Sequence, residues 1–286
     1  IQDLSSNYNQ PYKSDKIENL LVYNGEIYNY KDFFDYKNYT SDTKALYELM
    51  SNNKSNLSKF DGIFSFVFWN KNENNLYFAR DRFGVKPLFL LIKNDFIAFS
   101  SSIRAIKKLC EKFFELSLNL EYLNESIEIG YTHNDSTIFK EINKLNKNTL
   151  FKLDLESWNF SNKKIYSDKL FNLKTKKNIS QNSLELIIKE TIKSQIITSN
   201  RGVGFFLSGG TDSSLLVSEA LKLDTKSKIN TFSLIVPGED TNELKNINAF
   251  KNIFKDLKKI SFKKDAFVKS KIINALIEYK SLDYPV

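Results

Sequence analysis

Residues 203–214 read VGFFLSGGTDSS, a short apolar segment that runs directly into serine and glycine residues. The apolar part has the length of a strand, and the segment after the loop carries apolar residues at helical spacing. A strand that ends in Ser-Gly-Gly and turns into a helix exposes the unpaired amides of the first helical turn and the positive end of the helix dipole. The stretch therefore predicts a phosphate-binding loop.

The polar residues of this loop have a structural alternative. Ser208, Ser213 and Ser214 can donate hydroxyl hydrogen bonds to a phosphate, whereas Asp212 suits either Mg²⁺ or the cap of the helix. The loop is not of the Walker type, because no Gly-Lys-Ser/Thr follows at the required spacing. A serine- and glycine-rich turn before a well-capped helix would have the same composition.

Strand and helix patterns alternate around this loop. Helical periodicity precedes it at 184–196, strand patterns follow at 229–236 and 259–262, and helical patterns follow at 244–257 and 266–279. Such alternation is typical of a doubly wound parallel sheet. We therefore predict one α/β domain over residues 181–286.

The first 158 residues show a different pattern, with short apolar runs separated by turn residues. Strands are predicted at 20–23, 63–69, 75–79, 87–92 and 96–100, and helices at 43–51 and 102–113. The pattern predicts a layered α/β or α+β sandwich over residues 1–158. Residues 159–180 are polar, lysine-rich and without clear periodicity, so we predict a linker there.

Composition limits the class of protein. Among 286 residues, 41% are hydrophobic and 27% charged, which is typical of a soluble globular protein. The single cysteine excludes an intrachain disulfide framework and favours a reducing, cytoplasmic compartment. We expect no membrane segment, because no run of 18 apolar residues occurs. The net charge of +8 comes mostly from dispersed lysines, which favours a solvated surface over a nucleic-acid site.

Four motifs occur in order along the first domain: NGEIYN at 24–29, SDT at 41–43, FDGIFSF at 60–66 and ARDRFGVKPL at 79–88. These motifs resemble blocks of the glutamine-hydrolysing asparagine synthetases. The loop at 208–214 resembles the SGGxDS pyrophosphate loop of the ATP pyrophosphatases in the same group. The resemblance covers nearly the whole chain and implies a glutamine amidotransferase domain of the N-terminal-nucleophile type, followed by a synthetase domain of the adenine nucleotide α-hydrolase type.

The resemblance implies a ligase that uses glutamine, ATP and Mg²⁺. In that family, an N-terminal cysteine releases ammonia from glutamine, and the ammonia reaches a carboxylate that ATP has activated as an acyl-adenylate. Aspartate is the default acceptor. Asn24 and Gly25 match the oxyanion-stabilising positions, and both, with Glu26 and Asp42, match the glutamine-binding positions. Asp212 is the candidate Mg²⁺ ligand. The matching ATP-binding positions are Leu207, Ser208, Gly209, Gly210, Asp212, Ser213, Ser214 and Leu234.

The chain also departs from the family pattern. It has no counterpart of the nucleophilic cysteine, and we expect a fragment truncated at both ends. Cys110 lies in a helical pattern and is expected to be a buried structural thiol, and His133 lies in a polar turn. Two alternatives stay open: a relative that amidates another acceptor, such as a surface-polysaccharide sugar or a β-lactam precursor, and a non-catalytic ATP-binding relative. The expected partners are small molecules, with a homodimer as the assembly considered.

Overall fold

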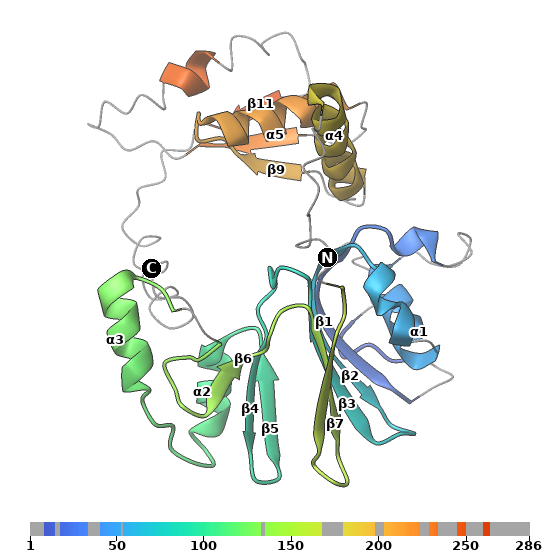
Figure 1. The fold of residues 1–286 in the computed structure, drawn as a ribbon, viewed down its shortest axis with the longest axis vertical. Coiled ribbons are helices and arrows are strands. Elements are labelled where there is room, and N and C mark those ends of the chain that lie inside the picture. Colours follow the sequence, from blue (N-terminus) through green and yellow to red (C-terminus); the bar gives the residue numbers. More distant parts are fainter. Residues whose placement is uncertain are drawn as a thin grey trace. The chain divides into compact units, whose positions relative to one another are not determined.

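The computed structural model describes residues 9–14, 18–33, 41–52, 54–132, 135–167, 180–197, 203–223, 229–233, 245–249 and 260–263. The described residues divide into two compact units, 9–167 and 180–263 (Figure 1). Each unit is described separately below.

The first unit contains a five-stranded antiparallel sheet in the order β1-β2-β3-β7-β8. Its strands are β1 (Leu20–Ile27), β2 (Gly62–Asn70), β3 (Asn75–Arg80), β7 (Thr149–Asp154) and β8 (Phe160–Lys164). A second antiparallel sheet has the order β5-β4-β6, from β4 (Phe89–Lys93), β5 (Phe96–Ser100) and β6 (Ile142–Lys144).

Three α-helices accompany these sheets: α1 (Asp42–Asn52), α2 (Ile103–Cys110) and α3 (Leu120–Ile129). Two short 3₁₀ helices, Tyr30–Asp32 and Lys54–Lys59, flank α1 in the sequence. The amino end of α1 is capped by Ser41, whose hydroxyl oxygen accepts a hydrogen bond from the Thr43 amide at 3.1 Å.

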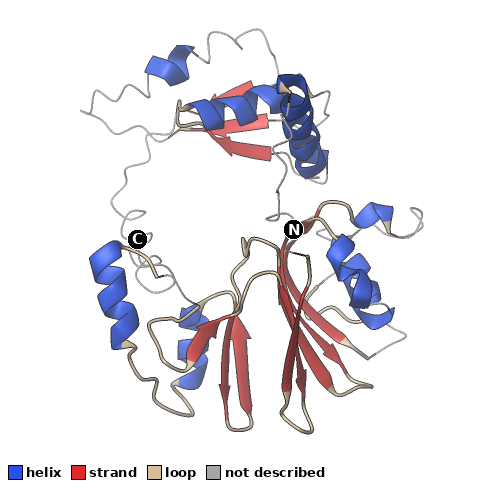
Figure 2. Ribbon diagram, in the orientation of Figure 1, coloured by secondary structure: helices blue, strands red, loops and turns tan. Residues whose placement is uncertain are grey.

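Three hydrophobic clusters show that the first unit has four layers. One cluster joins α1 to one face of the larger sheet, with Tyr47 against Phe68. The second lies between the two sheets and includes Phe78 and Leu88. The third joins the smaller sheet to α2. The order is therefore helix, sheet, sheet, helix (Figure 2), which confirms the predicted α/β sandwich.

The second unit confirms the predicted parallel sheet. Strands β9 (Val203–Phe206), β10 (Ile229–Phe232) and β11 (Ile260–Lys263) are parallel in the order β11-β10-β9. Helices α4 (Gln181–Ile197) and α5 (Thr211–Lys222) pack on this sheet through Ile192, Ile196 and Ala220. Residues 245–249 are helical, and Ile247 packs against Leu207 and Val217. The helix predicted at 266–279 lies outside the described residues.

The structure corrects the predicted boundary at residue 158. Strand β8 lies inside the predicted linker and pairs with β7, from Leu153 opposite Phe160 to Thr149 opposite Lys164. Tyr166, two residues further on, is buried in the core of the first unit. The larger sheet therefore continues past the predicted end of the first domain. Among the described helices, none is long and apolar enough to cross a membrane.

Candidate active sites

The NGEIYN motif forms the end of β1, where two glycines allow the backbones of β1 and β2 to approach closely. Gly25 lies opposite Phe64, and Gly62 lies opposite Ile27. A Cβ atom on Gly25 would lie 2.3 Å from the Ile63 carbonyl oxygen, and one on Gly62 would lie 2.2 Å from the Glu26 carbonyl oxygen. Only glycine fits at either position, because these contacts are with backbone atoms that cannot move aside.

Asn24 and Glu26 flank Gly25 and share one face of the strand. Asn24 is exposed, and its Nδ2 donates to the Ser101 hydroxyl oxygen at 3.2 Å. Glu26 is half-buried near Tyr28. Burial raises the pKa of the Tyr28 phenol to about 12, and the charges of Glu26, Asp61 and Asp81 add to that effect. The end of β1 therefore carries an exposed amide beside a group of carboxylates.

Asp42 lies at the amino end of α1, but its side chain is only 3% exposed. Its Oδ2 accepts hydrogen bonds from the Tyr23 hydroxyl at 2.7 Å and from the Ile27 amide at 3.1 Å. Burial raises the pKa of the Asp42 carboxyl, and these two hydrogen bonds oppose that shift. Asp42 thus ties α1 to β1. Its predicted role in binding glutamine stays a prediction.

The ARDRFGVKPL motif forms a loop that Asp81 organises. The Asp81 carboxylate accepts hydrogen bonds from four backbone amides at 3.0–3.1 Å, those of Phe64, Phe83, Val85 and Lys86. Gly84 adopts a left-handed φ of 67°, which supports the tight turn expected at this position. The loop therefore has a fixed shape.

In the second unit, the Ser-Gly-Gly loop lies between β9 and α5 as the sequence predicted. Gly210 is the N-cap of α5, and no side chain of the described residues caps it. Two serine hydroxyls brace the loop: Ser208 and Ser213 Oγ lie 3.0 Å apart, and the amides of Ser208 and Gly210 each donate to one of them at 3.3 Å. Because the amides at the start of a helix have no intrahelical acceptor, this end of α5 can donate to an anion.

The residues predicted to bind ATP differ in how far they are exposed to solvent. Ser208, Gly210 and Asp212 are exposed, while Gly209, Ser213 and Ser214 are half-buried. The Leu207 side chain is 1% exposed in the core, so it is not presented to a ligand. Leu234 lies outside the described residues.

The predicted Mg²⁺ site depends on one carboxylate of the described residues, that of Asp212. Among the described residues, no three His, Cys, Asp or Glu side chains gather as a metal cluster. One exposed carboxylate in the first turn of α5 fits the way Mg²⁺ is commonly held, by one or two carboxylates together with substrate phosphates. The role of Asp212 as a Mg²⁺ ligand stays a prediction.

Cys110 is fully buried against the smaller sheet, and burial raises the pKa of its thiol. Both observations fit the structural role predicted from the sequence, because a buried protonated thiol is a poor nucleophile. His133 lies outside the described residues.

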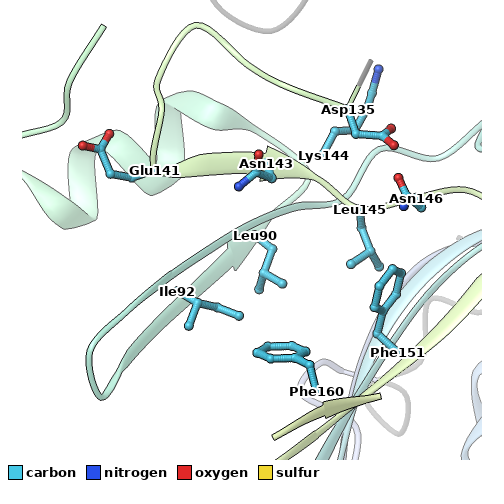
Figure 3. A pocket seen from close by; sticks show the side chains of 10 residues that line it. All are labelled: Leu90, Ile92, Asp135, Glu141, Asn143, Lys144, Leu145, Asn146, Phe151 and Phe160. Carbon is cyan, nitrogen blue, oxygen red and sulfur yellow. The ribbon is translucent and has the colours of Figure 1, made fainter. Parts of the chain in front are cut away.

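A pocket of about 370 Å³ was not predicted from the sequence (Figure 3). Its apolar walls are Leu90, Ile92, Leu145, Phe151 and Phe160, from both sheets and the segment between β6 and β7. Polar residues of the pocket include Asp135 and Lys144. Burial lowers the pKa of the Lys144 ammonium, as does the charge of Arg80, and Asp135 opposes both. None of the predicted site residues lines this pocket.

The family models that match the two units define a class of protein, one that combines a glutamine amidotransferase domain with an asparagine synthase domain. The family model described as glutamine amidotransferase domain matches residues 1–166, and the model described as asparagine synthase matches residues 183–279. The chain belongs to the glutamine-hydrolysing asparagine synthetase family.

Curated relatives agree with this assignment. Glutamine-hydrolyzing asparagine synthetase 1 of Bacillus subtilis is 30% identical over 236 residues, which are 80% of this chain and 36% of the relative. A putative asparagine synthetase of Methanocaldococcus jannaschii is 27% identical over 266 residues, 84% of this chain and 50% of the relative. The mouse enzyme is 29% identical over 224 residues, 74% of this chain and 38% of the relative. The chain spans half or less of the length of these relatives.

Proposed function

We propose that this chain is part of an enzyme that amidates a carboxylate with ammonia from glutamine, using ATP to activate the acceptor as an acyl-adenylate. Aspartate is the proposed acceptor, because the relatives are named asparagine synthetases. The proposal assigns glutamine to the sandwich unit and ATP to the parallel-sheet unit. The observation that carries it is the amino end of α5, which a glycine loop presents without a side-chain cap.

The ATP assignment is supported by the geometry of the loop. The first amides of α5 and the hydroxyls of Ser208 and Ser213 lie within one short segment, so they can act together on a phosphate chain. The helix dipole adds partial positive charge there. A pyrophosphate leaving group would gain the same interactions as it develops charge, which favours attack of a carboxylate oxygen on the α-phosphorus.

The glutamine assignment is supported by the end of β1. The exposed Asn24 amide can donate to an oxyanion, and the backbone of Gly25 lies beside it in the same strand. The Glu26 carboxylate can accept hydrogen bonds from the α-ammonium of glutamine. The Ser101 hydroxyl, which accepts from Asn24, holds that amide in one orientation.

Calorimetric titration of the chain with MgATP tests the ATP assignment. We expect measurable binding that Gly210→Ala abolishes. A Cβ at Gly210 would come no closer than 3.4 Å to any neighbour, the Ser208 Oγ, and its φ of −75° is accessible to alanine. The variant should therefore fold normally while its methyl group obstructs close approach of a phosphate.

Leu216→Ala, an exposed position on the same helix, is the matched control and should bind MgATP as the unmodified chain does. Asp212→Ala should weaken binding of MgATP more than binding of ATP without the metal. Equal affinity of Gly210→Ala and Leu216→Ala would remove the phosphate assignment.

A further inference from the structure

The two arginines of the ARDRFG segment have opposite hydrogen-bonding environments. Arg80 is buried, and three of its nitrogens donate to carbonyl oxygens, those of Lys86, Leu145 and Gly84, at 2.9, 2.5 and 2.6 Å. Arg82 is half-buried, but among the described residues no acceptor or carboxylate pairs with its guanidinium. Because a guanidinium carries five N–H donors, Arg82 keeps its hydrogen-bonding capacity for another group.

The aromatic ring of Tyr166 holds Arg82 in place. The guanidinium carbon lies 4.3 Å from the centroid of this ring, a cation–π contact. Tyr166 is itself fixed: its hydroxyl donates to the Phe60 carbonyl at 2.7 Å, and its amide donates to the Asn148 Oδ1 at 2.8 Å. Asn148 Nδ2 in turn donates to the Tyr166 carbonyl at 3.1 Å. The orientation of Arg82 is therefore set before any ligand binds.

A polar pocket of about 490 Å³ lies beside this pair. Among the described residues, its lining combines two cations, two serine hydroxyls, an aromatic ring and one aliphatic residue, and none of these six is a carboxylate: Ser58, Arg82, Lys164, Ile165, Tyr166 and Ser167. Lys164 is the last residue of the edge strand β8. Burial raises the pKa of the Tyr166 phenol, the charge of Arg82 opposes this shift, and the charges of Asp61 and Asp81 add to it. Neither carboxylate lines the pocket. The Asp81 carboxylate is already held by its four amide donors.

We propose that this pocket, which is lined by none of the residues assigned to glutamine or ATP, binds a phosphate-type oxyanion. A planar guanidinium binds such an anion through two parallel hydrogen bonds, and an ammonium adds a second positive charge. Two cations match a dianion better than a monoanionic carboxylate. The volume leaves room for an ester substituent on the phosphate.

Inorganic phosphate is the probe, with titrations followed by the NMR resonance of the Arg82 Nε–H and by thermal unfolding at constant ionic strength. Phosphate can also bind at the amino end of α5, so the Arg82 resonance and the difference between variants isolate this pocket. We expect the resonance to shift in a saturable way. Arg82→Gln should remove most of the thermal stabilisation that phosphate gives by binding in this pocket. Lys164→Gln should weaken phosphate binding several-fold.

Arg104→Gln, an exposed arginine on α2, is the matched control and should leave the phosphate response unchanged. Lys164→Gln lies on an exposed strand edge, so it keeps the test valid if Arg82→Gln does not fold. An Arg82 resonance that does not move with phosphate would overturn the proposal. An equal response to acetate would also overturn it, because a carboxylate site would then be indicated.

Discussion

Asp81 shows how one side chain can organise a loop. Its carboxylate is 1% exposed and accepts four amide hydrogen bonds from two segments of the chain. In Asp81→Asn, one oxygen would become an NH₂ group that faces amide donors, which leaves buried donors unsatisfied. We expect a loss of about 3 kcal/mol or more in the free energy of unfolding, because charge-assisted buried bonds are costly to break.

Urea unfolding of Asp81→Asn, followed by circular dichroism, measures this loss. Asp95→Asn is the matched control, since Asp95 is exposed in the turn between β4 and β5, and it should change the free energy of unfolding by no more than about 0.5 kcal/mol. If the two variants unfold at the same urea concentration, Asp81 does not stabilise the loop as described.

At this scale the sequence predicted residue types better than residue roles. It identified the ARDRFG segment, but nothing in the letters separates Arg80, which binds three carbonyls, from Arg82, which binds none of the described acceptors. Likewise, the sequence did not predict that the side chains of Leu207 and Asp42 are buried, and their roles in binding ATP and glutamine stay predictions. Such roles depend on neighbours distant in the sequence, which periodicity and spacing do not report.

At the scale of elements, the close approach of β1 and β2 predicts that Gly25 cannot be replaced without a loss of stability. Gly25→Ala would place a methyl group 2.6 Å from the Phe64 Cα, and only a shift of the strands could relieve this clash. We expect a loss of about 3 kcal/mol in the free energy of unfolding, the upper end of the usual cost of overpacking. Gly210→Ala adds the same methyl group at an ordinary van der Waals distance, 3.4 Å from Ser208 Oγ, and should leave the midpoint of thermal unfolding nearly unchanged. Comparable thermal midpoints for the two variants would contradict the packing described for β1 and β2.

Whole elements were predicted well where side-chain periodicity was strong. The predicted strand at 96–100 has the same bounds as β5, and the helix predicted at 43–51 lies within α1. Strand β8 was missed because all five of its side chains are exposed, so only its hydrogen bonds to β7 define it. Helix α3 was missed although its sequence carries end signals: Asn119 Oδ1 accepts from the Tyr122 amide at 3.2 Å, and Gly130 ends the helix with a φ of 77°.

For the molecule as a whole, the division into two units was predictable because each half has its own pattern of apolar residues. No described residue belongs both to one of the three clusters of the sandwich unit and to one of the two clusters of the parallel-sheet unit. Each unit therefore has a core of its own, as expected of a domain. The NGEIYN, ARDRFGVKPL and Ser-Gly-Gly motifs were recognisable in the sequence because each combines polar residues with a glycine. The glycine allows a close approach of strands or a tight turn.

The 286-residue chain as a whole is predicted to release no glutamate from glutamine. Its single cysteine is Cys110, which lies on α2, is fully buried and has a raised thiol pKa, so it cannot supply an exposed thiolate. A coupled assay for glutamate, run with and without MgATP, measures this directly, and Cys110→Ser distinguishes the origin of any signal. Release that persists in Cys110→Ser would show a different nucleophile, and release that disappears would show that Cys110 becomes accessible. Either result would contradict the structural role of this thiol or the need for a cysteine nucleophile. No glutamate release from either protein would agree with a chain in which the proposed glutamine site, at Asn24, Gly25 and Glu26, has no thiolate.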